Sequence, residues 1–225
     1  MKRTSAVVFL AMILLLSTSC IINIYPNENG GTTKSSERSL VSFEFEAVKD
    51  NLSVQDMEAP IQKIQLRLSD YSSDATVRQK GDNHIVIELP QEYATTPYLR
   101  EITSPGTLIF CTDASDPEGS KVMDGNDIAN AQVGTDSENN YIVLLQFTED
   151  GQKKYADVTG KIAGTGDPLY IMYDGEVISN PTTKEQINSP KCQIEGDFTY
   201  DLASSLARFI RIGTLPVGLK PIEGK

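Results

Sequence analysis

Residues with the chemistry of catalysis are sparse in this sequence. His84 is the only histidine, and no cysteine lies near it, so the sequence has no histidine and cysteine cluster that could bind zinc. With a single histidine there is also almost no candidate for a serine–histidine catalytic pair. Gly164 and Gly166 flank a threonine, but they lack the lysine and the following helix of a phosphate-binding loop. We interpret His84 as a residue beside a hairpin turn and the two glycines as a turn. The sequence therefore predicts neither an enzyme nor a bound cofactor.

Acidic residues form the one cluster that resembles a metal site. Carboxylate oxygens are ligands that calcium prefers, but the spacing here differs from the Asp-x-Asp-x-Asp-Gly pattern of a calcium loop. Asp174 and Glu176 flank Gly175, which suits a hairpin turn better than a pair of catalytic carboxylates. We expect a solvated loop and no metal at the clustered residues, which are Asp113, Asp116, Glu118, Asp124 and Asp127.

The chain is acidic, with a net charge of −11 from 20 basic and 31 acidic residues. Lys2 and Arg3 are the only charged residues before Cys20, so the part from Cys20 onward has 18 basic and 31 acidic residues, a net charge of −13. A nucleic-acid-binding protein needs a basic surface, and an anionic membrane surface would repel this domain. The composition therefore argues against a nucleic-acid partner, and membrane association requires a lipid attachment.

The N-terminal residues have the pattern of an export signal. Lys2 and Arg3 precede an apolar run, Ala6–Leu16, that is too short for a comfortable membrane crossing. Small residues then lead directly into Cys20, which predicts lipidation of that cysteine after cleavage of the signal peptide, residues 1–19. The alternative is an uncleaved anchor helix extended by the isoleucines after Cys20. Both alternatives place the remainder on the extracytoplasmic face of a bacterial membrane.

Residues 20–39 are predicted to be the lipidated cysteine and a flexible linker. The stretch from Tyr25 to Ser39 contains almost no side chain suited to burial. A linker of this kind spans about 20–25 Å on average. A folded domain after residue 39 is therefore expected to lie just above the membrane surface.

The two remaining cysteines, Cys111 and Cys192, lie far apart in the sequence. In an oxidising compartment they would be able to form a disulfide, but no local spacing indicates one. Two buried free thiols are the alternative. The sequence leaves both open.

The first half of the folded part has the pattern of an α+β fold. Alternating apolar and polar residues indicate strands, and apolar residues at steps of three and four indicate a helix. The order β-α-β-β-α-β is a ferredoxin-like pattern, with helices on one face of an antiparallel sheet. The predicted elements are a strand over 42–47, a helix over 57–71, a hairpin of 76–80 with 84–89, a helix over 96–102 and a strand over 106–111.

A second α+β unit follows the acidic loop. Thr148 is predicted to cap one helix, and Asp197 or Thr199 another, whose buried side carries Leu202, Leu206, Phe209 and Ile210. Gly213 ends that helix in a left-handed conformation. The other expected elements are strands over 141–147, 169–173, 177–178 and 193–195, and an edge segment over 215–222.

Two stretches are similar to one protein family. Val77–Pro90 resembles a hairpin that ends in Leu-Pro-Gly in that family, although Gln91 stands here in place of the glycine. The second stretch is more specific, and its matching segments are Asp174–Pro181, Ile194–Thr199, Leu202–Ala203, Leu206–Ala207 and Arg211–Pro216, with Asp124–Ala131 fitting the entry to this region. The family is SecD, a membrane protein of Sec protein export, and the resemblance covers its first extracytoplasmic domain over residues 42–222.

The resemblance implies a ferredoxin-like base into which a head subdomain is inserted. On that basis the base is expected at 40–113 plus 214–222, and the head at 114–213. Ser189-Pro190 departs from the family pattern, which usually has glycines there. The sequence ends at Lys225, whereas SecD continues into transmembrane helices that perform proton coupling, so we expect no proton coupling here.

The function implied by the resemblance is assistance of protein export without proton coupling, by binding exported polypeptides or Sec translocon components. The alternative is an envelope lipoprotein that uses the SecD-like fold to bind another partner. Four residues of the most family-like stretch are candidates for polypeptide binding, although each also fits a core position: Tyr173, Ile178, Pro181 and Phe198.

Overall fold

The computed structural model describes residues 39–49, 52–69 and 71–222 of the chain. Two large hydrophobic cores and one small apolar cluster form within them. The predicted signal peptide, Cys20 and nearly all of the linker lie outside the described residues. We call the part built from β1–β3, α1, α2 and β11 the base, and the part built from β4–β10, α3 and α4 the head.

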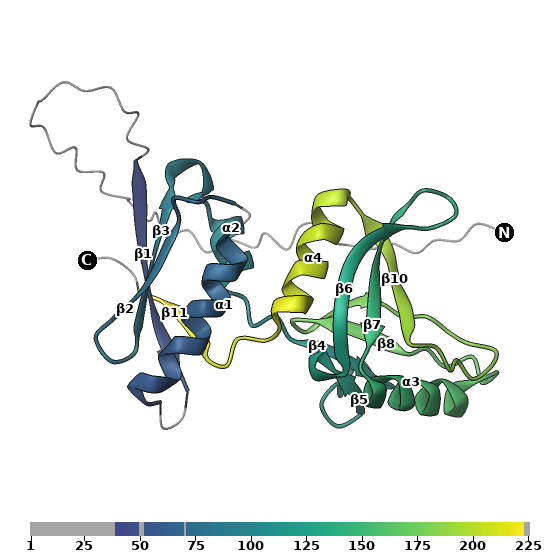
Figure 1. Ribbon diagram of the computed structural model, residues 1–225. Coiled ribbons are helices and arrows are strands. Elements are labelled where there is room, and N and C mark those ends of the chain that lie inside the picture. Colours follow the sequence, from purple (N-terminus) through teal and green to yellow (C-terminus); the bar gives the residue numbers. More distant parts are fainter. Residues whose placement is uncertain (1–38, 50–51, 70, 223–225) are drawn as a thin grey trace, which may run out of the picture. The chain divides into compact units, whose positions relative to one another are not determined.

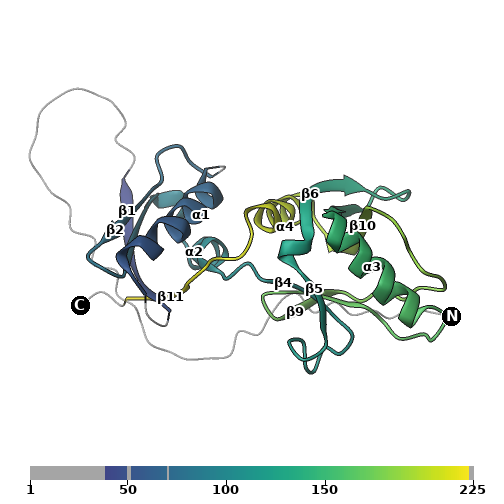
Figure 2. The ribbon, with the colours of Figure 1, turned by 60° about the horizontal axis from the view of Figure 1, so that its bottom comes forward.

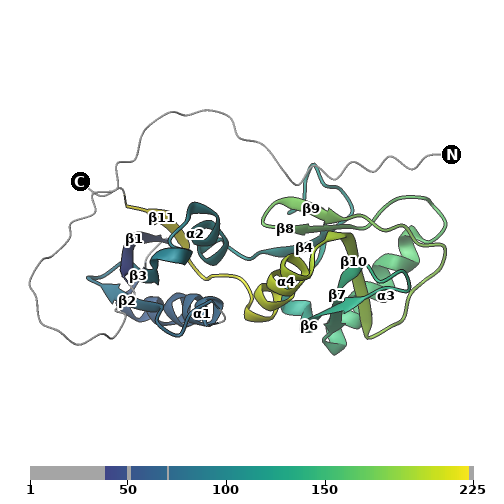
Figure 3. The same ribbon diagram turned by 90° about the horizontal axis from the view of Figure 1, so that it is seen from above.

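The base has one four-stranded sheet, in the order β11-β1-β3-β2, in which every neighbouring pair is antiparallel. The alternation in β1 places Phe45 and Ala47 in the core, and Phe45 lies opposite Ile85 of β3 and Pro221 of β11. Helices α1 and α2 lie on one side of this sheet (Figures 1 and 3). The elements are β1 (Leu40–Val48), α1 (Glu58–Leu68), β2 (Thr76–Lys80), β3 (His84–Pro90), α2 (Thr96–Thr103) and β11 (Gly218–Pro221).

The strand predicted over 106–111 forms at Leu108–Cys111 as β4, but it does not join the base sheet. It pairs instead with β5 (Lys121–Asp124) and β8 (Tyr170–Tyr173) in the head. All four residues of β4 are buried, which requires apolar cover on both faces. The base sheet receives its fourth strand from β11, so the expectation that β4 belongs to the base is wrong, and the predicted edge segment after Gly213 is confirmed.

The head contains two sheets, one of order β10-β7-β6 and one of order β5-β4-β8-β9. Its core joins residues of both sheets and of both helices, and α4 runs beside β6 in two views (Figures 1 and 2). The sequence patterns missed β5 and β6. The remaining elements of the head are β6 (Ile128–Thr135), β7 (Tyr141–Phe147), α3 (Glu149–Ile162), β9 (Glu176–Ser179), β10 (Lys191–Phe198) and α4 (Tyr200–Ile212).

The two head helices begin at the predicted caps. The hydroxyl of Thr148 accepts a hydrogen bond from the Gly151 N–H at 3.0 Å, and that of Thr199 accepts one from the Leu202 N–H at 3.2 Å. Gly213 ends α4 with a φ of 78°, as expected. Leu202, however, is 42% exposed, because the buried stripe of α4 starts one residue later, at Ala203.

Cys111 and Cys192 are both free thiols. Cys111 is buried, and its Sγ lies 3.6 Å from the Sδ of Met172. Cys192 packs half-buried against the head core. The structure therefore favours two free thiols over a disulfide between these residues.

Candidate functional site

The four candidate residues for polypeptide binding all lie in the head, but they differ in exposure. Tyr173 in β8, Ile178 in β9 and Phe198 at the end of β10 are half-buried and pack against the head core. Pro181 lies two residues after β9 and is exposed, and Val177 of β9, four residues earlier, is 41% exposed. Three candidates are thus largely core residues, while the β9 segment offers exposed apolar side chains.

Tyr173 is held where β4 enters the head. Its hydroxyl is buried and has no hydrogen-bond partner among the described residues, and burial raises the pKa of this phenol well above its usual value. The neighbouring Asp174 has a φ of 49°, and its carboxylate accepts a hydrogen bond from the Thr107 N–H at 2.7 Å. Asp174 therefore builds the β8–β9 turn and ties it to the start of β4, as the turn interpretation of Asp174-Gly175 expects.

Arg67 is the charged residue that sequence reasoning missed. It lies on the buried stripe of α1, three residues after Ile64, and none of its surface is exposed. Its Nη1 donates to the carbonyl oxygens of Ile102 at 3.0 Å and Ser104 at 2.5 Å. Its Nη2 lies 3.4 Å from the carbonyl oxygens of Pro105 and Gly213.

The chain passes from the base to the head after α2 and returns to the base after α4. The Arg67 guanidinium therefore contacts both connecting segments. The guanidinium also lies over the ring of Phe209, 5.1 Å from its centroid, and burial lowers the pKa of Arg67. Gly106 is required beside it, because a Cβ there would overlap the Arg67 guanidinium. A charged residue spaced as a core residue of α1 was the signal available in the sequence.

A group of aromatic side chains is exposed at the end of the head where β7 begins and β10 ends. Phe198 lies opposite Tyr141 in the strand register, and Tyr200 follows as the first residue of α4. The rings of Tyr141 and Tyr200 meet edge to face, with centroids 5.5 Å apart and planes at 68°. Tyr141 is 37% exposed and Tyr200 52%. We call Tyr141, Phe198 and Tyr200 the tyrosine patch.

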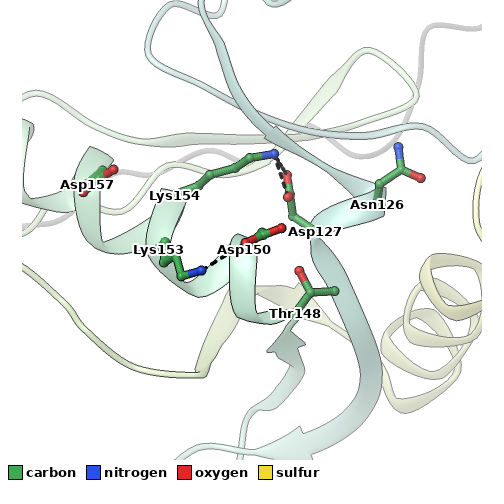
Figure 4. Close-up of a pocket in the computed structure, with 7 residues that line it drawn as sticks. All are labelled: Asn126, Asp127, Thr148, Asp150, Lys153, Lys154 and Asp157. Carbon is green, nitrogen blue, oxygen red and sulfur yellow. Dashed lines mark hydrogen bonds and ion pairs between the residues drawn. The ribbon is translucent and has the colours of Figure 1, made fainter.

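An open pocket of about 520 Å³ lies at the start of α3 (Figure 4). Its lining is polar and largely charged, but four of its five charged side chains are paired. Lys154 donates to both carboxylate oxygens of Asp127, at 2.7 and 3.0 Å, and Lys153 pairs with Asp150 at 3.2 Å. Asp127 also accepts from the Asp124 N–H at 3.0 Å. This arrangement holds α3 against the turn at 125–127, and nothing in its geometry indicates a ligand.

The other residues that sequence reasoning considered are structural. His84 on β3 contacts Glu44 through Nδ1 at 2.7 Å, and Lys80 pairs with the same carboxylate at 2.6 Å on the surface of the base. Asp113 and Asp116 accept hydrogen bonds from N–H groups of their own loop. The described part of the chain contains no group of three or more His, Cys, Asp or Glu side chains placed to hold a metal ion.

The fold and sequence match one family in the comparisons. Residues 115–217 match the family model described as the SecDF P1 head subdomain. The protein translocase subunit SecD of Acidaminococcus fermentans is 31% identical over 166 residues, which cover 73% of this chain and 38% of that protein. SecD of Sebaldella termitidis is 27% identical over 227 residues, covering 98% of this chain and 54% of that protein.

A solved structure of SecDF, described as a membrane component that enhances protein export, has the same fold. The TM-score is 0.66 at 24% identity, and the match covers 82% of this chain and 99% of that one. The chain thus spans 38% and 54% of the lengths of the two SecD relatives. No helix within the described ranges is long and apolar enough to cross a membrane.

Proposed function

Because the chain resembles the first extracytoplasmic domain of SecD, with a SecDF P1 head subdomain over residues 115–217, we infer that it assists protein export outside the cytoplasm. Its role is to bind exported polypeptides or Sec translocon components, and not to perform chemistry. The single observation that carries this proposal is the match to SecD, which extends over 73% of the chain at 31% identity.

The proposal includes how the domain is placed. Residues 1–19 serve as the signal peptide, Cys20 carries the lipid, and the linker to residue 39 holds the domain near the membrane surface. Two acyl chains are sufficient for stable anchoring, whereas one is marginal. This supports attachment through lipid, since the part from Cys20 onward has a net charge of −13, from 18 basic and 31 acidic residues, which opposes binding to anionic headgroups.

The architecture proposed for the base is ferredoxin-like, with β11 as its fourth strand. The order β11-β1-β3-β2 and the antiparallel pairing of each neighbour support this. The head then occupies the chain between α2 and β11. In this arrangement both crossings between base and head pass the Arg67 guanidinium.

The proposed polypeptide-binding surface of the head includes the segment around β9. β9 is an edge strand of its sheet, and Val177 and Pro181 expose apolar surface along it. An extended chain is able to bind such an edge by adding a strand, while its side chains contact the exposed apolar groups. Tyr173 in β8 and Ile178 in β9 pack against the head core and so support this surface. Phe198, at the end of β10, belongs to the tyrosine patch instead.

Site-specific photo-crosslinking in living cells tests the proposal. A photoreactive residue at Pro181 is expected to capture exported polypeptides or translocon components, identified by mass spectrometry. Leu66 on α1 of the base, which is 55% exposed, provides the control position. Equal labelling from both positions would contradict polypeptide binding by the head, and capture of one unrelated envelope protein would favour the alternative partner.

A further inference from the structure

The acidic surroundings of the tyrosine patch indicate which polypeptide segments it binds. The two stretches that form this end of the head, 135–141 and 193–202, contain no lysine, arginine or histidine. Their five acidic residues are Asp136, Glu138, Glu195, Asp197 and Asp201. The two stretches that carry the exposed aromatic pair therefore contribute only negative charge.

Several of these carboxylates are not engaged by other groups. Asp136 is occupied, because it accepts hydrogen bonds within its own turn, from the N–H groups of Glu138 and Asn140. Asp197 and Asp201 are exposed and have no hydrogen bond or ion pair with any described residue. They flank Phe198 and Tyr200, so they lie beside the exposed rings in the sequence and on the same segment of the fold.

A cation fits this combination of groups. The face of a tyrosine ring attracts a guanidinium or ammonium group, and an adjacent carboxylate adds a charge-assisted hydrogen bond. Apolar side chains of the same ligand gain from contact with Tyr200, which is 52% exposed, and with the rim of Phe198. An anionic lipid surface is disfavoured for the same reason, since the carboxylates would repel it.

We propose that the tyrosine patch binds extended polypeptide segments in which arginine or lysine alternates with apolar residues. This inference rests on the proposed function, polypeptide binding during export, and adds a preference for basic segments at a surface separate from β9. The preference is electrostatic, so it weakens as salt screens the exposed charges.

Fluorescence anisotropy with the full chain tests the proposal. The probe is a labelled twelve-residue peptide of alternating leucine and arginine, compared with matched peptides in which arginine is replaced by glutamate or leucine by serine. The arginine–leucine peptide is expected to bind most tightly. Raising NaCl from about 0.05 M to about 0.5 M should remove most of its advantage over the glutamate peptide.

Two variants address the patch itself. The double variant Asp197→Asn/Asp201→Asn and the single variant Tyr200→Ala are each expected to weaken binding about threefold to tenfold at low salt. The matched controls, Glu92→Gln/Glu149→Gln and Leu66→Ala, change exposed residues away from both the tyrosine patch and β9 and should bind as the unaltered chain does. Circular dichroism of each variant confirms that it is folded.

The outcomes separate this inference from the function on which it rests. Equal binding of the glutamate peptide, or unchanged binding by both patch variants, would overturn the preference while leaving crosslinking from Pro181 unaffected. Tighter binding to vesicles of anionic lipid than to the peptide would show a membrane surface instead. Peptide binding at the patch without crosslinks to exported chains would overturn the proposed function alone.

Discussion

Replacement of Arg67 by methionine should destabilise the folded chain strongly. Methionine fills much of the same volume but has no N–H donor, so the carbonyl oxygens of Ile102 and Ser104 lose partners at 3.0 and 2.5 Å. The two longer contacts, at 3.4 Å to the oxygens of Pro105 and Gly213, contribute less.

The magnitude follows from two opposing effects. A hydrogen bond from a charged group contributes about 1.5–3 kcal/mol, so two well-formed bonds contribute about 3–6 kcal/mol. Removing a buried charge also relieves its desolvation cost, which offsets part of that loss. We expect a net loss of about 3 kcal/mol in the free energy of unfolding, a large share of the roughly 5–15 kcal/mol typical of a domain.

Urea unfolding followed by circular dichroism measures this change. With a slope of about 2 kcal/mol per molar urea, the midpoint should fall by about 1.5 M. Arg78→Met provides the control, because Arg78 forms only an exposed pair with Glu88 at 3.5 Å and should contribute less than about 1 kcal/mol. Arg67→Lys keeps the charge but not the planar fork and should fall between the two. A midpoint for Arg67→Met equal to or above that of the unaltered chain would refute the reasoning.

Three further predictions concern single sites. Gly151→Ala should lower the free energy of unfolding by more than about 2 kcal/mol, because its Cβ would overlap the backbone oxygen of Asp127. Gly160→Ala in the same helix meets only the flexible side chain of Gln186 and should change stability by less than about 1 kcal/mol in urea unfolding. Hydrogen bonds from Ser53 lower the pKa of Asp56 from 3.8 to about 2, so Ser53→Ala should move the carboxyl titration observed by NMR upward. The stabilisation from this carboxylate is present above pH 3.8 and is lost as the pH falls towards 2. An unchanged carboxyl titration in Ser53→Ala would contradict the role given to the Ser53 hydroxyl. Burial raises the pKa of the Cys192 thiol to about 12. Labelling of this thiol by a maleimide at pH 8, followed by mass spectrometry, should therefore be about a thousandfold slower in the folded chain than in urea. Equal rates would show that the thiol is accessible.

Local sequence patterns predicted most elements of the base and head because those patterns depend on near neighbours. The alternation in 42–47, the turn at Gly81 and the hydroxyl caps at Thr148 and Thr199 each correspond to a described element. β6 was missed because Ile128–Thr135 has mostly small or polar side chains and contains a glycine, so it lacks the composition of a strand. It forms because it pairs with β7 along its length.

Pairing between distant segments could not be predicted in the same way. β4 and β11 are both strands of four residues, and local spacing alone does not determine which of them lies beside β1. The choice depends on burial, since β4 pairs with β5 and β8 at its two edges and its side chains are buried in apolar clusters on both faces. The role of Arg67 was missed for a related reason: its acceptors are backbone carbonyls 35 to 146 residues away, and these carry no mark in the sequence.

Of the four candidate binding residues, Pro181 alone is exposed, and the tyrosine patch was identified only in part, through Phe198. Tyr141 and Tyr200 belong to elements that were predicted separately, and their contact depends on the register of β7 with β10. The acidic residues of this end of the head were visible in the sequence, but without the ring pair they indicated no surface.

A pulse–chase version of the crosslinking measurement tests the central claim most directly. Cells carrying a photoreactive residue at Val177 of the exposed β9 edge are pulse-labelled and then irradiated at successive times of the chase. The account predicts adducts with newly made exported chains that appear early and disappear as export is completed. Adducts that do not change during the chase, or that appear equally from Leu66 of the base, would contradict it.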